Sequence, residues 1–322
     1  MTIDRQLDPE MAPLFAMLGL ADRPLFDLAD LDAARATMRH LAQAGLDAAP
    51  ARDGIETVER IVPGGRPDEW VRLRITRPTD GGSAMPALLW FHGGGMLLGS
   101  AADDDPLAAR LAATIGCAVV AVEYRLAPEH PFPAALDDGH AAYGWLAEHA
   151  TQEGIAPDRI AIGGFSAGAG LAASVALRLR DGGSPSPLFL SLTAPMLDDR
   201  QDSPSSRETC AMGVWDRAAN IAAWNAYLGP KDTAEAPYAV PARALDLSRL
   251  PPTFMAIGEI DLFRDEAMAF VQRLVAAGVP TEFHLYPGAC HGFDGLNPEA
   301  SVSRSFSASW LSYLERMFAR GA

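Results

Sequence analysis

The chain has 322 residues, of which 49% are hydrophobic and 21% charged, and its formal net charge is −15 at pH 7. This composition excludes a disordered or fibrous chain, and the negative charge, which no basic stretch offsets, makes nucleic acid a poor partner. No uncharged apolar run reaches the roughly 18 residues of a transmembrane helix, so we expect no membrane span.

The first 50 residues alternate short helix-like segments with Pro and Gly. Residues 1–8 are acidic and lack the apolar core of a secretory signal, so we expect a cytoplasmic protein. Apolar side chains then recur at spacings of three and four, which predicts an amphipathic helix over Leu28, Leu31, Ala34, Met38 and Leu41.

Two β-like runs follow, Ile55–Val62 and Trp70–Arg77. In the second run, apolar residues alternate with polar ones at Val71, Leu73 and Ile75. This period of two predicts a half-exposed strand pair.

From residue 87 onward, short apolar runs alternate with helix-compatible stretches. The continuously apolar runs, which are typical of strands covered on both faces, are Ala87–Phe91, Cys117–Val122, Ile160–Ile162, Leu188–Thr193, Phe254–Ile257 and Phe283–Tyr286. The helix-compatible stretches between them are Ala134–Ala150, Ala167–Arg180, Arg264–Ala277 and Ser303–Ala319. This alternation predicts a doubly wound α/β fold with a mostly parallel sheet.

One interval, from Leu197 to Leu250, is too long for a single crossover. It is polar at first and then carries a helix-like apolar pattern at Trp215, Ile221, Trp224, Tyr227 and Leu228. We interpret it as a partly helical insertion above the strand ends, and an ordinary peripheral helix remains the alternative.

A nucleophile is indicated by Gly164-Phe165-Ser166-Ala167-Gly168, which matches the pattern G-x-S-x-G. A predicted strand precedes it and a predicted helix follows. A turn this sharp forces Ser166 into strained backbone angles, and small neighbours at Gly164 and Gly168 relieve the crowding. The alternative is a tight turn with a purely structural role.

Acyl transfer also needs backbone N–H groups aimed at the developing oxyanion. The loop His92-Gly93-Gly94-Gly95 follows a predicted strand, and its glycines let the backbone approach a substrate closely. We predict that Gly94, Gly95 and Ala167 are the donors, and that His92 holds the loop by hydrogen bonding. A phosphate loop is disfavoured, since neither G-x-G-x-x-G nor G-K-[ST] is present.

Seven histidines compete for the role of general base: His40, His92, His130, His140, His149, His284 and His291. His291 is favoured because it lies in a loop after a predicted strand, at the sheet edge where catalytic groups of α/β folds collect. Asp261, directly after the preceding strand, is the matching acid, in the chain order Ser, Asp, His. Glu259 is a rival, while Asp265 and Glu266 fall in the first turn of a helix, where carboxylates are common for dipole reasons alone.

These motifs together resemble the hormone-sensitive-lipase-like esterases, called bacterial family IV, of the α/β-hydrolase superfamily. Further matches over residues 55–320 are Glu123–Glu129 (E-Y-R-L-A-P-E), Phe132–Ala135, Asp261–Glu266 and His291–Phe293. The resemblance implies a catalytic domain at 51–197 and 251–322. It also implies a helical cap made of 1–50 and the 198–250 insertion. The sequence departs from the family at Phe165, usually Asp, Glu or Thr, and at Ala169, often Gly; both bear on substrate preference.

The resemblance further implies a serine carboxylester hydrolase that acts on short- to medium-chain acyl esters through an acyl-enzyme, without a metal or organic cofactor, often as a homodimer. An amide or arylformamide hydrolase with the same groups is the alternative enzyme. A ligand-binding protein that has lost turnover is the alternative of another class. Three cysteines, Cys117, Cys210 and Cys290, are too widely spaced to indicate a zinc site or a disulfide framework, so we expect reduced and mostly buried thiols.

Overall fold

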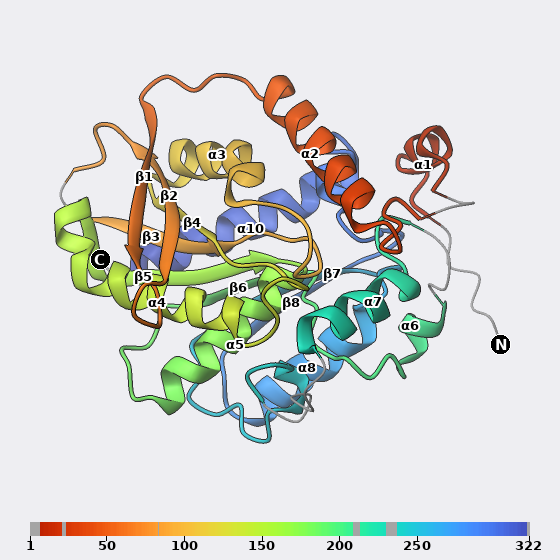
Figure 1. Ribbon diagram of the computed structural model, residues 1–322. Coiled ribbons are helices and arrows are strands. Elements are labelled where there is room, and N and C mark those ends of the chain that lie inside the picture. The colour runs from red at the N-terminus through yellow and green to blue at the C-terminus, as the bar shows by residue number, and fades with distance from the viewer. Residues whose placement is uncertain (1–6, 21–23, 83, 209–212, 230–236, 321–322) are drawn as a thin grey trace.

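The computed structural model describes residues 7–20, 24–82, 84–208, 213–229 and 237–320. Eight strands form one sheet (Figure 1): β1 (Ile55–Pro63), β2 (Trp70–Pro78), β3 (Met85–Phe91), β4 (Ala118–Glu123), β5 (Ile155–Phe165), β6 (Leu190–Thr193), β7 (Thr253–Gly258) and β8 (Thr281–Tyr286). Their order is β1-β2-β4-β3-β5-β6-β7-β8, and all neighbours from β4 to β8 run parallel. The expected α/β sheet is confirmed.

The first two strands form the expected antiparallel pair, with Val62 opposite Val71. Gly64 donates its N–H to the carbonyl of Glu69 at 2.7 Å, which closes the turn between them. β2 then pairs antiparallel with β4, so this ribbon forms one edge of the parallel sheet. Because one face of the ribbon meets solvent, its apolar side chains alternate with polar ones.

Helices cover both faces of the sheet (Figure 1). One buried cluster includes residues of α4 (Ala134–His149), α5 (Ala167–Asp181) and α8 (Arg264–Ala276). The other includes residues of α3 (Asp105–Ile115) and α10 (Ser301–Arg320). β3 is buried along its whole length, which is why its sequence is continuously apolar rather than alternating.

Two details differ from the expectation. β8 is not covered on both faces, since most of its residues are partly exposed. It is also the last strand of the sheet, and nothing pairs with its outer edge among the described residues. The helix α3 was not predicted, although Asp105 and Pro106 in its first turn are typical of a helix start.

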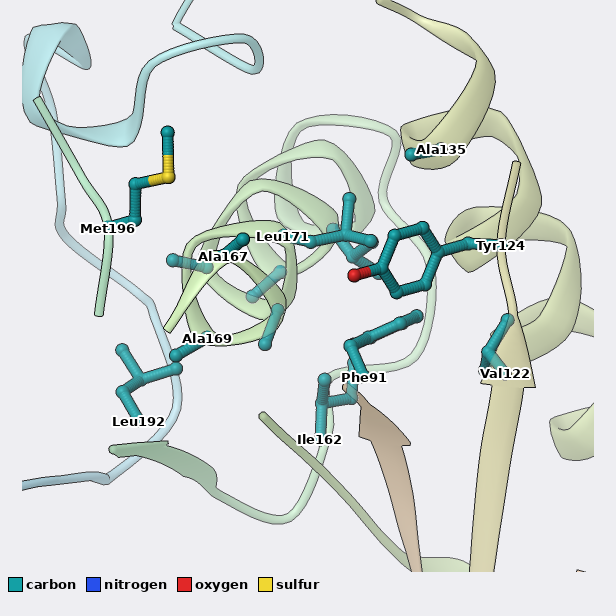
Figure 2. Packing of buried hydrophobic residues seen from close by; sticks show 14 of the residues in the cluster. Phe91, Val122, Tyr124, Ala135, Ile162, Ala167, Ala169, Leu171, Leu192 and Met196 are labelled. Carbon is teal, nitrogen blue, oxygen red and sulfur yellow. The ribbon is translucent and has the colours of Figure 1, made fainter. Parts of the chain in front are cut away.

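Most residues of α5, the helix that follows the nucleophile turn, are buried. Ala167, Ala169 and Leu171 are fully buried, and Figure 2 shows α5 lying close to Phe91 and Ile162 of the neighbouring strands. Small side chains on α5 let its backbone approach the sheet closely. The end of β5 and the start of α5 are therefore held in one place.

The N-terminal and inserted segments also form helices: α1 (Ala12–Leu18), α2 (Leu31–Ala48), α6 (Pro204–Glu208) and α7 (Arg217–Leu228). The predicted amphipathic helix corresponds to α2, whose N-cap Asp30 accepts a hydrogen bond from Ala33 N. Leu41, however, is 38% exposed and lies outside the buried face. None of the helices in these described segments or elsewhere in the described chain is long and apolar enough to cross a membrane.

The two segments contact each other although they are about 190 residues apart. Gly213 N donates to the carbonyl of Leu20 at 3.0 Å, and the rings of Phe26 and Trp215 lie 6.4 Å apart. Arg35 on α2 in turn binds both carboxylate oxygens of Glu129 through Nη1 and Nη2, and its Nε donates to the carbonyl of Leu97. The N-terminal helices are thus fixed to the loops at the carboxyl edge of the sheet.

Candidate active site

Ser166 is the single residue between the end of β5 and the start of α5. Its backbone angles are φ 57° and ψ −120°, a region that L-residues rarely adopt. Ser166 N donates to the carbonyl of Thr193 at 2.9 Å, which ties the turn to the neighbouring strand β6. The strained turn is thus held by the sheet, and it projects the side chain at the carboxyl edge.

Glycines at positions 164 and 168 are required by close backbone contacts. A Cβ on Gly168 would lie 2.5 Å from the carbonyl carbon of Phe91, and one on Gly164 would lie 2.7 Å from the amide nitrogen of Ala169. Both distances are far below ordinary carbon contacts of about 3.5–4.0 Å. The absence of side chains lets the helix start pack against the end of β3 and its following loop.

The structure brings Ser166, His291 and Asp261 together in one hydrogen-bonded row. His291 Nε2 lies 3.0 Å from Ser166 Oγ, and His291 Nδ1 lies 2.8 Å from Asp261 Oδ2. The three residues are 3%, 6% and 1% exposed. Since Nδ1–H donates to the carboxylate, Nε2 is free to accept the hydroxyl proton of the serine.

The acid and the base are positioned by the loops after β7 and β8. Asp261 Oδ1 accepts a hydrogen bond from Phe263 N at 2.9 Å, which fixes the carboxylate. Ile260 N donates to the carbonyl of Ala289 at 3.0 Å, which joins the two loops. The rival carboxylate, Glu259, instead accepts from Gly288 N at 3.1 Å. Of the two, only Asp261 hydrogen bonds to the imidazole.

Asp265 and Glu266 have a further role beyond the helix dipole, which sequence reasoning missed. Asp265 Oδ2 accepts from Ser205 N at 2.7 Å, and Glu266 Oε1 accepts from Leu197 N at 2.7 Å. Burial raises the pKa of Glu266 well above its ordinary value. These carboxyl groups attach the start of the inserted segment to the first turn of α8, which follows the loop of Asp261.

The glycine loop after β3 turns sharply at the same edge. Gly94 and Gly95 have φ values of 114° and 62°, which favour glycine, and a Cβ on Gly94 would lie 2.6 Å from the carbonyl carbon of Leu98. Neither N–H donates to another backbone group within the described chain. Ala167 N–H, at the first turn of α5, likewise has no intrahelical acceptor.

His92 lies under this loop rather than beside Ser166. Its Nδ1 donates to the carbonyl of Gly93 at 2.7 Å, and its ring stacks on Tyr124 with centroids 4.2 Å apart. Tyr124 OH donates to the His92 carbonyl at 2.8 Å. Burial lowers the pKa of His92, which keeps the imidazole neutral. Tyr124, which lies in the E-Y-R-L-A-P-E motif, thus supports this loop, a role that the sequence did not indicate.

The inserted segment reaches the glycine loop through Trp215. A Cβ on Gly95 would lie 2.5 Å from Cζ2 of this indole and 3.3 Å from Cβ of Ala223 on α7. Trp215 Nε1 donates to Asn220 Oδ1 at 3.1 Å, which fixes the ring. The apolar pattern of residues 215–228 thus includes the residues that cover the loop.

The other titratable candidates lie in ordinary surroundings. His149 stacks on Trp145, and His284 contacts Glu282 at 3.0 Å on the edge strand. Cys117 and Cys290 are free and buried, and burial raises the pKa of each thiol to about 12. The third cysteine, at position 210, lies outside the described residues.

Comparisons with known proteins match the chain to one family and to several esterases. The family model of the alpha/beta hydrolase fold matches residues 88–295. The chain is 40% identical over 211 residues to Esterase LipI of Mycobacterium tuberculosis (65% of this chain, 66% of LipI). It is 36% identical over 227 residues to Carboxylesterase NlhH of the same organism (69% of this chain, 71% of NlhH). The solved structure of a bacterial heroin esterase is similar with a TM-score of 0.92 and 40% identity, covering 97% of this chain and 98% of that one.

Proposed function

The chain belongs to the hormone-sensitive-lipase-like branch of the α/β-hydrolase fold family and is a serine carboxylester hydrolase, and on this premise we propose that Ser166, His291 and Asp261 carry out the reaction. The observation that carries this proposal is the row of contacts from Ser166 Oγ through the imidazole to Asp261, at 3.0 and 2.8 Å. The nucleophile contacts its base, and the base contacts the group that orients it.

In the first half of the reaction, His291 Nε2 takes the proton of Ser166, and Oγ bonds to the ester carbonyl carbon. The carbonyl electron pair moves to the oxygen and gives a tetrahedral oxyanion. When the oxyanion collapses, the bond to the alcohol oxygen breaks, and Nε2 returns its proton to the leaving alcohol. The product is an ester of Ser166, while Asp261 stabilises the transient imidazolium.

Water completes the cycle by the same groups. His291 Nε2 takes a proton from water, whose oxygen bonds to the acyl carbon. The second oxyanion then collapses with breakage of the bond to Ser166 Oγ, which regains the proton. A carboxylic acid leaves, and the enzyme returns to its starting state.

We assign oxyanion stabilisation to the N–H groups of Gly94, Gly95 and Ala167. These groups meet at the carboxyl edge from two different elements, the loop after β3 and the first turn of α5. The helix start adds partial positive charge at the same place. Loss of one such donor costs about 10²–10³-fold in kcat in comparable enzymes. Close packing of Gly168 against Phe91 supports a fixed distance between the two donor groups.

We propose residues 1–50 and 198–250 as a cap over residues 51–197 and 251–322, which form the catalytic domain. The contact between Phe26 and Trp215 supports one joint unit, and the contact of Trp215 with Gly95 brings it to the proposed oxyanion loop. Such a cap would supply apolar walls for an acyl chain, at about 0.8 kcal/mol per buried CH₂. We therefore propose short- to medium-chain acyl esters as substrates.

The experiment that tests this function is a series of p-nitrophenyl esters from acetate to dodecanoate, measured with burst kinetics beside the matching p-nitroanilides. We expect a burst equal to the enzyme concentration and the highest kcat/KM on a short or medium ester. Faster cleavage of the anilides would contradict the proposal and indicate an amide hydrolase. Absence of both burst and turnover would indicate a ligand-binding protein that has lost turnover.

Two further properties of the protein, its location and its oligomeric state, are proposed with this function. We propose a cytoplasmic location and a homodimer, the latter from the family resemblance. Light scattering of the purified chain measures the oligomeric state directly, and a monomer at micromolar concentration would refute the dimer.

A further inference from the structure

The residue that precedes the nucleophile reaches the proposed base with its aromatic ring. The ring of Phe165 stacks on the imidazole of His291, with centroids 5.0 Å apart and an interplanar angle of 29°. A second ring, that of Phe263, lies nearly perpendicular to the imidazole at 5.3 Å. The imidazole is 6% exposed, so aromatic groups rather than water form much of its surroundings.

Phe165 contacts two of the catalytic loops at once. A Cβ on Gly93 would lie 2.7 Å from Phe165 Cδ1, so the ring lies directly against the glycine loop. A Cβ on Gly292 would lie 3.6 Å from Phe165 Cζ, so the same ring borders the loop that carries the base. Since Phe165 also precedes Ser166 in the chain, its side chain joins the nucleophile, oxyanion and base loops.

We propose that Phe165 is a positioning residue for His291, whose ring face holds the imidazole in line with Ser166 and stabilises the imidazolium formed during acyl transfer. This inference rests on the proposed role of His291. The face of an aromatic ring carries partial negative charge and attracts a cation within about 6 Å of its centroid. The attraction is stronger in a site with little water, and it acts only when the imidazole carries a proton.

Several other groups face His291 or its partners. Asp261 accepts from Nδ1, and the charge of Asp294, whose pKa burial raises, acts on His291 from the following helix turn. The Cys290 thiol, with a pKa raised to about 12, is neutral. Burial also raises the pKa of Glu266, which lies close enough for charge interaction with Asp261. Substitution of Phe165 by an uncharged residue removes none of these groups and adds no charge.

The test compares Phe165→Leu, which removes the π face, with Phe165→Tyr, which keeps it. Phe283→Leu, a half-buried phenylalanine on β8, is the matched control for loss of an aromatic ring elsewhere. Active sites are counted with a fluorophosphonate, and kcat and kcat/KM for p-nitrophenyl acetate are measured across pH. Wild-type enzyme that neither reacts with the fluorophosphonate nor hydrolyses the ester would mean that the proposed function itself has failed.

For Phe165→Leu we expect kcat to fall about 3- to 30-fold with little change in KM. The acid limb of kcat/KM should move to lower pH by about half a unit, because the protonated imidazole loses stabilisation relative to the neutral one. Phe165→Tyr should keep the wild-type kcat and the wild-type position of the acid limb, and Phe283→Leu should leave the acid limb unchanged. If the leucine variant does not fold, Phe165→Met supplies the same comparison.

An acid limb that stays at its wild-type position in a folded Phe165→Leu enzyme overturns the proposal, whether or not kcat falls. The ring would then only fill space. A shift of equal size in Phe283→Leu would overturn it as well, because the effect would not depend on contact with His291.

Discussion

The contact between the nucleophile helix and the end of β3 gives a sharp prediction for Gly168→Ala. The added Cβ would lie 2.5 Å from the carbonyl carbon of Phe91, about 1 Å short of an ordinary carbon contact. Both partners are backbone, so the start of α5 must move away from β3 by roughly that amount. Overpacking of this kind costs about 1–3 kcal/mol of the free energy of unfolding. The same displacement separates Ala167 N–H from Gly94 and Gly95, and a 1 Å error in such a site costs on the order of 10²-fold in kcat.

The chain supplies a matched control in Gly144, an exposed glycine on α4 with no heavy atom within 4 Å of its added Cβ. Gly144→Ala should stabilise the protein by up to about 1 kcal/mol and leave kcat unchanged. Urea unfolding gives the stability of each variant, and p-nitrophenyl acetate turnover per fluorophosphonate-titrated site gives kcat. A Gly168→Ala enzyme with wild-type stability and a kcat within threefold of wild type would refute the proposed geometry of the turn.

Three further predictions follow from the same structure. Asp261→Asn should fold and lose about 10⁴-fold in kcat, whereas Asp265→Asn should lose less than about 10-fold; the reverse order would mean that the acid is wrongly assigned. Burial raises the pKa of Asp104 to about 6, so the folded state holds a proton that the unfolded chain releases near pH 4. The free energy of unfolding should therefore fall by about 2–3 kcal/mol as the pH rises from about 4 to about 6. Asp104→Asn, which keeps an acceptor for Trp90 Nε1, should abolish this fall in urea unfolding at pH 4 and pH 8; parallel curves for the two proteins would contradict it. Deletion of residues 1–29, which ends before the N-cap of α2, should flatten the acyl-length preference of a folded enzyme that still reacts with a fluorophosphonate; an unchanged preference would remove these residues from the proposed cap.

The parts of the site that depend on local sequence could be predicted. The strand, the turn at Ser166 and the following helix are encoded within one continuous stretch, residues 155–181, because the glycines and the apolar runs act on their immediate neighbours. The approximate places of His291 and Asp261 followed from the rule that loops at the carboxyl ends of parallel strands meet at one edge.

Contacts between distant segments could not be predicted in the same way. The hydrogen bond from Leu197 N to Glu266 joins residues 69 positions apart, and nothing in the helix pattern around Glu266 distinguishes it from a dipole effect. The stacking of Phe165 on His291 depends on side-chain directions that an apolar pattern does not encode. β8 was misjudged for a related reason: its composition does not reveal that it lies at the edge of the sheet.

The central claim is that Ser166 forms the acyl-enzyme, and Ser166→Ala tests it most directly. Wild-type enzyme quenched during the burst with p-nitrophenyl acetate should carry one acetyl group, located by peptide mass spectrometry on Ser166. The alanine variant should fold, carry no acetyl group and lose on the order of 10⁴–10⁶-fold in kcat. A variant that retains more than about a tenth of the wild-type kcat, or an acetyl group found on another residue of the wild type, would contradict the account.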